Sequence, residues 1–137
     1  FGSYFPLEVP DNYIHDTFFN VPIDTLMYRI EQSVRAGHPV CWEGDISEDG
    51  FSFANGVAEL DNDAQQPTQA QRQEAFETYQ TTDDHCMEII GIAHNEKGYK
   101  YFICKNSWGK NNPFGGFMYL SYNYVRLKTI AAYMVRV

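Results

Sequence analysis

Two apolar runs of sequence joined by a short polar turn constrain this chain more than any other feature. The first run covers residues 86–92 (CMEIIGI) and the second covers residues 99–105 (YKYFICK). Between them, residues 95–98 (NEKG) form a turn signal of the kind that joins neighbouring strands. The pattern therefore predicts an antiparallel hairpin. His85 precedes the first strand and Asn106 follows the second, so the hairpin should bring these two residues to the same end.

A histidine and an asparagine held together in this way suit the activation of a thiol. A cysteine peptidase needs an imidazole that takes the thiol proton, and a group bonded to the other ring nitrogen that orients the ring. An ordinary polar pair that caps two strands is the alternative interpretation. The sequence Asn106-Ser107-Trp108-Gly109, placed directly after an apolar strand and downstream of His85, argues against it.

These segments resemble the second half of the papain family of cysteine peptidases, in both order and spacing. Within that family, further segments are similar to the branch that contains aminopeptidase C and bleomycin hydrolase. The stretches that carry the family resemblance are 84–91, 105–109 and 116–121, and those similar to the branch are 22–24, 37–40 and 44–45. The resemblance covers roughly residues 20 to 137.

The resemblance implies a role for three residues. His85 matches the catalytic histidine, Asn106 matches the asparagine that orients it, and Trp108 matches the indole that shields their hydrogen bond from water. It also implies an α+β fold, equivalent to the right-hand domain of papain, with an antiparallel half-barrel-like sheet and one or two helices. The implied activity is thiol-dependent hydrolysis of peptide bonds, with aminopeptidase action favoured over endopeptidase action.

The resemblance implies that the nucleophile of such an enzyme is missing from this chain. In papain-like enzymes the cysteine lies about 130 to 150 residues before the histidine and asparagine, which is upstream of residue 1 here. The glutamine of the oxyanion hole belongs to the same absent half. We therefore expect residues 1–137 to form one domain, the C-terminal part of a peptidase, which is inactive in isolation and needs its N-terminal half. A non-catalytic binding or inhibitory module with the same fold is the alternative.

The three cysteines offer no substitute nucleophile. Their odd number and the absence of a CxxC motif argue against a disulfide scaffold and a zinc site, so Cys41, Cys86 and Cys104 are interpreted as buried structural thiols. Cys41 lacks a Gly-rich helix start that would activate it. Cys86 follows His85 directly, and neighbouring side chains of a strand point to opposite faces.

The remaining composition excludes several classes of partner. Eighteen acidic residues against ten basic ones give a net charge of −8, which argues against nucleic-acid binding. No apolar run is long enough to span a membrane.

His15, His38 and His94 stand alone as predicted surface residues, so we expect no metal and no cofactor. The expected partner is a peptide substrate, and a homo-oligomer is possible. The cytoplasm is favoured as the compartment, with the periplasm as the alternative.

Other elements follow from periodicity and capping signals. Helical spacing predicts a helix over residues 24–36, with Asp24 as N-cap and Gly37 at its C-terminal end. A possible capping box at Thr68 and Gln71 predicts a second, exposed helix within 61–82. The remaining predictions are a strand over 39–45, a loop or irregular hairpin over 46–60, strands over 117–121 and 130–135, and no element in 1–20.

Overall fold

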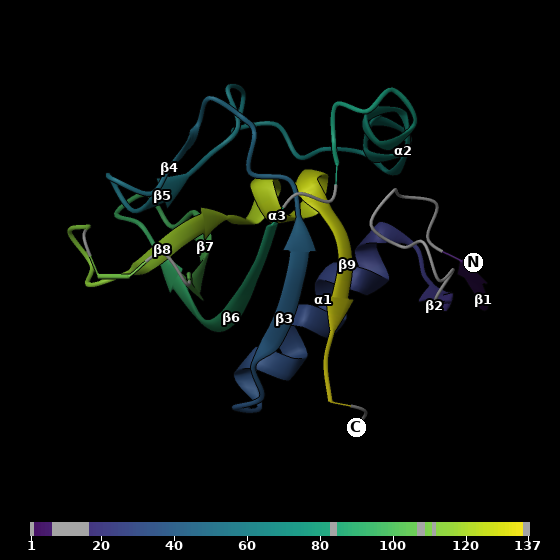
Figure 1. Cartoon of the computed structure of the whole chain (residues 1–137), viewed down its shortest axis with the longest axis horizontal. Coiled ribbons are helices and arrows are strands. Elements are labelled where there is room, and N and C mark those ends of the chain that lie inside the picture. Colours follow the sequence, from purple (N-terminus) through teal and green to yellow (C-terminus); the bar gives the residue numbers. More distant parts are fainter. Residues whose placement is uncertain (1, 7–16, 83–84, 107–108, 111, 136–137) are drawn as a thin grey trace.

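The computed structural model describes residues 2–6, 17–82, 85–106, 109–110 and 112–135 (Figure 1). Three helices and nine strands are found among these residues. In chain order they are β1 (Ser3–Pro6), β2 (Thr17–Asn20), α1 (Ile23–Arg35), β3 (Val40–Gly44), β4 (Phe51–Ser52), β5 (Val57–Ala58), α2 (Gln69–Glu77), β6 (His85–His94), β7 (Lys100–Lys105), β8 (Phe117–Ser121), α3 (Tyr122–Lys128) and β9 (Thr129–Tyr133).

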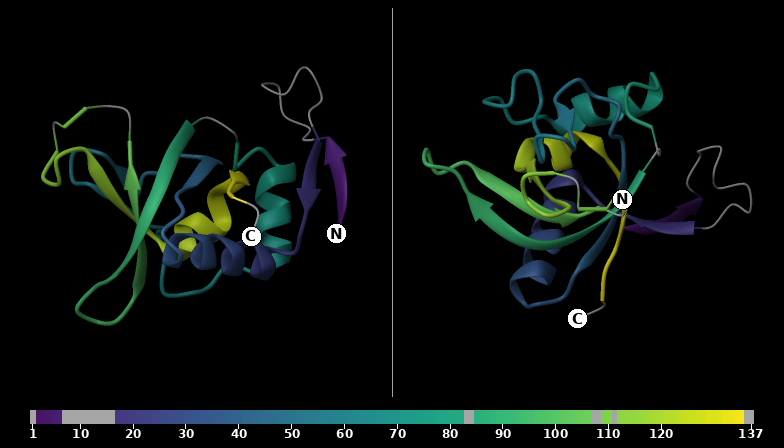
Figure 2. Two further views of the ribbon diagram at one scale, coloured as in Figure 1. Left: turned by 90° about the horizontal axis from the view of Figure 1, so that it is seen from below. Right: turned by 60° about the vertical axis from the view of Figure 1, so that its left-hand side comes forward.

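A curled sheet of seven strands forms the centre of the molecule, in the order β4-β5-β8-β7-β6-β3-β9. Neighbouring strands are antiparallel, except that β5 and β8 are parallel. The register shifts between Ile89 and Gly91 in β6 and between Glu43 and Gly44 in β3. Bulges of this kind bend a sheet, and Figure 2 shows the resulting curl. The α+β class with a half-barrel-like sheet is thereby confirmed.

The core lies between the sheet and α1, which passes behind β3 in Figure 1. Met27 and Ile30 of α1 are buried because they fall one helical turn apart on one face. Strands β3, β6 and β7 supply the facing layer, and its largest members are Trp42, Ile89 and Phe102, all fully buried. A buried aromatic or aliphatic side chain of this size contributes about 1.5–3 kcal/mol to the free energy of unfolding.

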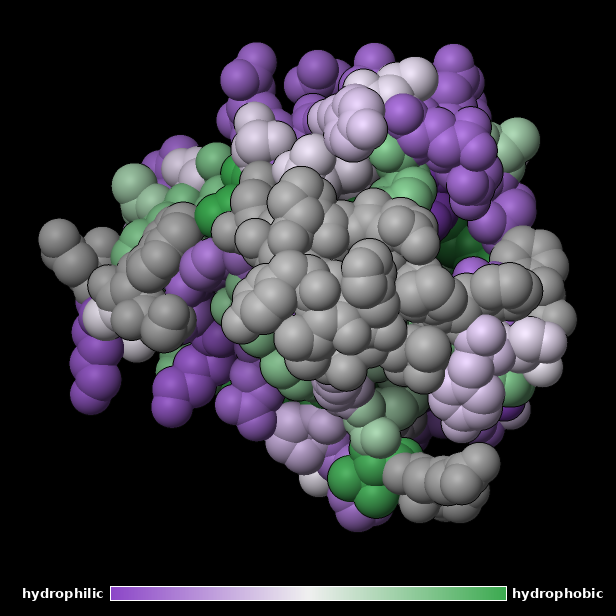
Figure 3. Space-filling model, turned by 45° about the vertical axis from the view of Figure 1, so that its right-hand side comes forward, coloured by the Kyte–Doolittle hydropathy of each residue, from purple (hydrophilic) through white to green (hydrophobic). Residues whose placement is uncertain are grey.

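Two buried cations of α3 hold the helices to the end of the sheet. Arg126 forms an ion pair with Asp24 of α1 at 2.6 Å and donates a hydrogen bond to the carbonyl oxygen of Pro67, just before α2. Lys128 forms an ion pair with Glu48 and donates to the carbonyl oxygen of Gln80. Helix α2 itself stays on the surface with only Ala75 buried, and Figure 3 shows that the upper rim of the molecule, where α2 lies, is mainly hydrophilic.

Most of the predicted elements are confirmed with small shifts in their bounds. Helix α1 begins at Ile23 after Pro22, so the prediction of Asp24 as N-cap is wrong; Asp24 lies in the first turn, where its charge favours the helix N-terminus. Gly37 follows the helix with a positive φ of 85°. The capping box of α2 is present, because Thr68 and Gln71 bond to each other's backbone N–H groups.

Three elements were not predicted. Strands β1 and β2 form a separate two-stranded sheet in a region where no element was expected, and the ring of Phe18 in β2 contacts Tyr133 of β9. Residues 122–128 form α3, which exceeds the prediction of one or two helices. The parallel pairing of β5 with β8 departs from an antiparallel sheet. No helix among the described residues is long and apolar enough to cross a membrane.

Candidate active site

The hairpin of β6 and β7 brings His85 and Asn106 together, because the start of β6 lies beside the end of β7. His85 is the first residue of β6 and lies opposite Gly44 of β3, whereas Asn106 comes directly after β7. The ring nitrogen Nε2 of His85 lies 3.1 Å from Oδ1 of Asn106, which is hydrogen-bond distance. Since an amide oxygen only accepts, this contact places the proton of a neutral ring on Nε2 and its lone pair on Nδ1.

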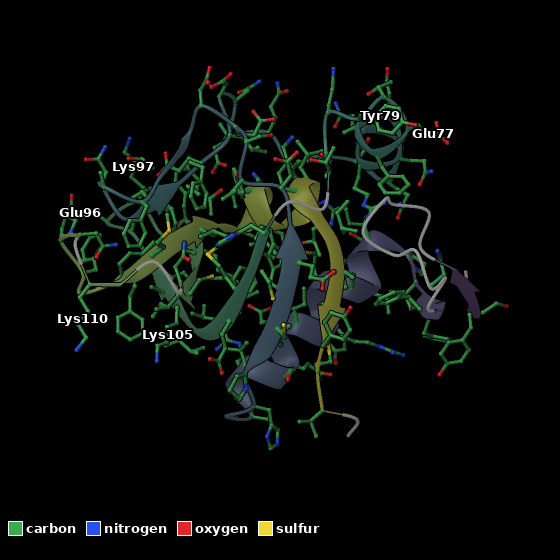
Figure 4. The ribbon with its side chains drawn as sticks, viewed as in Figure 1. Glu77, Tyr79, Glu96, Lys97, Lys105 and Lys110 are labelled. Atoms are coloured by element: carbon green, nitrogen blue, oxygen red, sulfur yellow. The ribbon has the colours of Figure 1, made fainter. Side chains whose placement is uncertain are left out.

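Asn106 is held in place by burial and by its backbone. The residue is only 4% exposed, and Nδ2 lies 3.9 Å from the sulfur of Met118 in β8. Its backbone N–H donates to the carbonyl oxygen of Gly116 at 3.4 Å. Lys105, the residue before it, points outward into solvent (Figure 4). The amide of Asn106 is therefore fixed on the inner side of a strand end.

Asn112, which sequence reasoning missed, organises the loop that contains Gly116. Its Oδ1 accepts hydrogen bonds from the N–H groups of Phe114 and Gly116, at 3.1 and 2.7 Å, and its Nδ2 donates to the carbonyl oxygen of Phe117 at 2.9 Å. A Cβ at Gly116 would lie 2.4 Å from the carbonyl oxygen of Gly109, so only glycine fits there. The Asn-Pro-x-Gly-Gly pattern of residues 112–116 was the signal for this turn.

Asp45 holds the chain just before His85. Its Oδ2 accepts the backbone N–H of Thr82 at 2.9 Å, and its Oδ1 accepts the N–H and hydroxyl of Ser47. The phenol of Tyr124 donates to the carbonyl oxygen of Asp45 at 2.8 Å. Burial by itself raises the pKa of Asp45, but these hydrogen bonds from Ser47 and Thr82, with the charge of Lys128, bring its pKa below the ordinary value.

Trp108 lies outside the described residues, so its role as a shield for the His85–Asn106 bond stays a prediction. The same applies to His15. His38 and His94 are exposed, as predicted. Within the part of the chain that the structure describes, no three His, Cys, Asp or Glu side chains are placed to hold a metal ion.

The prediction of three buried cysteines is right for one and wrong for two. Cys104 is completely buried in β7, and this burial raises the pKa of its thiol. Cys41 and Cys86 are exposed. Their strands alternate, with Val40 and Trp42 facing the core on either side of Cys41, so Cys41 faces outward. Val40-Cys41-Trp42-Glu43 carried that period-two signal in the sequence.

Comparison with known proteins gives one family and a fold. The model of the Peptidase C1-like family matches residues 7–132. PepW from Lactobacillus rhamnosis, a solved structure, superposes with a TM-score of 0.71 at 16% identity over 94% of this chain. The proform of the Amb a 11 cysteine protease, a ragweed pollen allergen, gives a TM-score of 0.48 at 20% identity over 82% of this chain. This chain spans 30% of the length of each. No curated protein matches.

Proposed function

Because the chain belongs to the Peptidase C1-like family, we propose that it supplies the general base, His85, and the orienting Asn106 of a papain-like cysteine peptidase. The observation that carries this proposal is the 3.1 Å contact between Nε2 of His85 and Oδ1 of Asn106. It leaves Nδ1 as the basic atom of the ring. A base oriented by a third group is the arrangement that activates a thiol nucleophile.

The reaction follows from this arrangement. Nδ1 of His85 accepts the proton of a cysteine thiol, and the thiolate attacks the carbonyl carbon of the peptide bond. The imidazolium then gives its proton to the departing amine, which leaves a thioester on the cysteine. His85 next takes a proton from water, which hydrolyses the thioester. Asn106 accepts from Nε2 throughout, so it keeps the ring in one orientation while its charge changes.

The nucleophile in this proposal lies in sequence upstream of residue 1. Cys104 is excluded as nucleophile by its burial and raised pKa, since the thiolate is the attacking form. Cys86 lies on the strand face opposite to that of His85. The isolated 137-residue chain is accordingly inactive. The resemblance of residues 37–40 to aminopeptidase C supports removal of amino-terminal residues from peptides as the activity of the complete enzyme.

The test uses the native protein from its source. Its intact mass and N-terminal sequence are measured, and it is then treated with an epoxide probe that alkylates the nucleophile of papain-like peptidases. We expect a longer chain in which one cysteine upstream of Phe1 takes the label, and we expect His85→Ala to abolish labelling without unfolding the protein. A native chain that begins at Phe1 and takes no label would overturn the proposal and favour a non-catalytic binding module.

A further inference from the structure

Cys41 and Cys86 form a close pair of thiols on the outer face of the sheet. Cys41 lies in β3 opposite Glu88, and Cys86 lies in β6 opposite Glu43, so the two cysteines are diagonal neighbours on adjacent antiparallel strands. Their sulfur atoms are 3.2 Å apart. Both side chains are exposed. An oxidant in solution therefore reaches two thiols that already touch.

Buried neighbouring residues hold the backbone of both cysteines in place. Val40 and Trp42, which flank Cys41, are completely buried, and Met87, which follows Cys86, is 3% exposed. These side chains anchor β3 and β6 in the core while the thiols project from the other face. The pair lines an open groove together with Pro39, Glu88 and Tyr133, and this groove extends to Asn106 of the candidate active site. Cys104 gives a contrast within the same molecule, because it is fully buried and its pKa is raised.

We propose that Cys41 and Cys86 are a reversible dithiol–disulfide site that reacts with low-molecular-weight disulfides such as oxidised glutathione. A disulfide bond is about 2.05 Å long, so the sulfur atoms need to approach by roughly 1.2 Å. Cys86 projects from the strand face opposite to that of His85, and the thiol–disulfide reaction uses neither His85 nor Asn106, so it does not depend on the proposed function.

The reaction is a pair of thiol–disulfide exchanges. One protein thiol loses its proton and attacks a sulfur of oxidised glutathione, which forms a mixed disulfide and releases one glutathione thiolate. The second protein thiolate then attacks the protein sulfur of the mixed disulfide and releases the other glutathione. The two protein thiols are oxidised by two electrons, and one oxidised glutathione is reduced to two thiols. Excess reduced glutathione drives the reverse reaction.

The experiment equilibrates the fully reduced 137-residue chain with mixtures of reduced and oxidised glutathione. The reaction is quenched with acid, thiols are alkylated before and after denaturation, and proteolytic peptides are identified by mass spectrometry. We expect a monomer that has lost two hydrogen atoms and yields a peptide linked through Cys41 and Cys86. Cys104 should be alkylated only after denaturation, with or without oxidised glutathione.

Single variants separate the proposed site from ordinary surface thiols. Cys41→Ser should stop at one stable mixed disulfide on Cys86, Cys86→Ser at one on Cys41, and Cys104→Ala should keep the cross-link. If the unaltered protein instead accumulates glutathione on both exposed thiols, or forms dimers linked between chains, the proposal is wrong. Circular dichroism of each variant shows whether it is folded, and a variant that does not fold is replaced by the Cys→Ala change at the same position.

Discussion

Among single residues, Asn106 has the most specific expected effect, because its amide oxygen sets the proton position of His85. Removing it leaves Nε2 of His85 without this acceptor. We predict that Asn106→Ala lowers kcat of the proposed peptidase more than it changes KM. The loss should be smaller than that of His85→Ala, since general base catalysis contributes about 10²- to 10⁴-fold. Steady-state hydrolysis of a fluorogenic peptide measures both constants.

The isolated chain gives a second measurement of the same effect. Nitrogen NMR of His85 should report a proton held on Nε2 in the unaltered chain and a mixture of tautomers in Asn106→Ala. Asn55→Ala is the matched control, because Asn55 is exposed in the turn between β4 and β5. An unchanged tautomer in Asn106→Ala would contradict an orienting role for this residue.

The residues of the candidate site differ in how well the sequence could predict them. His85 and Asn106 were found because a turn signal between two apolar runs fixes which strand ends meet. The contact of Cys41 with Cys86 depends on how β3 pairs with β6, two strands 40 residues apart in the chain whose register no local pattern contains. The exposure of Cys41 was readable from alternation in β3, but a general tendency of cysteine to be buried was given more weight.

Among the elements, α2 depends on its N-terminal cap more than on burial. Thr68 Oγ1 accepts from the N–H of Gln71 at 3.1 Å, and Gln71 Oε1 accepts from the N–H of Thr68 at 2.9 Å. We predict that Thr68→Ala lowers the free energy of unfolding by about 0.5–2 kcal/mol, as measured by urea denaturation. Thr78→Ala is the control. The hydroxyl of Thr78 donates to the carbonyl oxygen of Glu74, but the backbone N–H of Thr78 donates to the same oxygen, so this oxygen keeps a hydrogen bond in the variant. We therefore expect a smaller loss of stability than for Thr68→Ala. Equal losses would show that the cap is not the cause.

The indole of Trp42 and the C-terminal residue of α3, Lys128, leave no space for a side chain at Gly44. A Cβ there would lie 2.2 Å from the indole of Trp42 and 2.5 Å from the carbonyl oxygen of Lys128. Gly44→Ala should therefore destabilise the fold by about 1–3 kcal/mol or more and shift His85, which lies opposite it. Gly91→Ala in β6 is the matched control, since its Cβ would meet only the side chain of Ile103, and the closest atom, at 3.1 Å, is the flexible Cδ1. Thermal unfolding measures both, and a Gly44→Ala protein as stable as Gly91→Ala would contradict the contact geometry.

The elements that sequence reasoning missed are those fixed by distant contacts. The hairpin of β4 and β5 lies within the predicted loop or irregular hairpin over 46–60, but the parallel pairing of β5 with β8, about 60 residues away, was not predicted. Helix α3 has seven residues, too few to show a helical period, and two buried cations, Arg126 and Lys128, lie on it. Local periodicity predicted α1 and the β6–β7 hairpin because each is long enough to show a pattern.

Across the whole molecule, one buried carboxylate joins the parts that surround the candidate site. Asp45 lies just beyond β3, accepts the N–H of Thr82 ahead of β6, and receives the phenol of Tyr124 from α3 on its carbonyl oxygen. Its own N–H donates to the carbonyl oxygen of Lys128. Sequence motifs could indicate the family and the sheet, but they could not predict the contacts of Asp45. Its partners are distant in the sequence and come together only when the sheet curls.

The stability of the whole fold should therefore depend on the charge of Asp45 in acid. Hydrogen bonds lower the pKa of Asp45 in the folded state below its unfolded value of about 3.9, so the folded state binds fewer protons in acid. Its contribution is present above that value and is lost as the pH falls through the folded pKa. We predict that Asp45→Asn is less stable than the unaltered chain at neutral pH, and that the difference shrinks below about pH 4. Urea unfolding over a pH series measures it, with Asp61→Asn, an exposed carboxylate, as control. A difference that stays constant with pH would mean that packing, and not the charge of Asp45, holds this junction together.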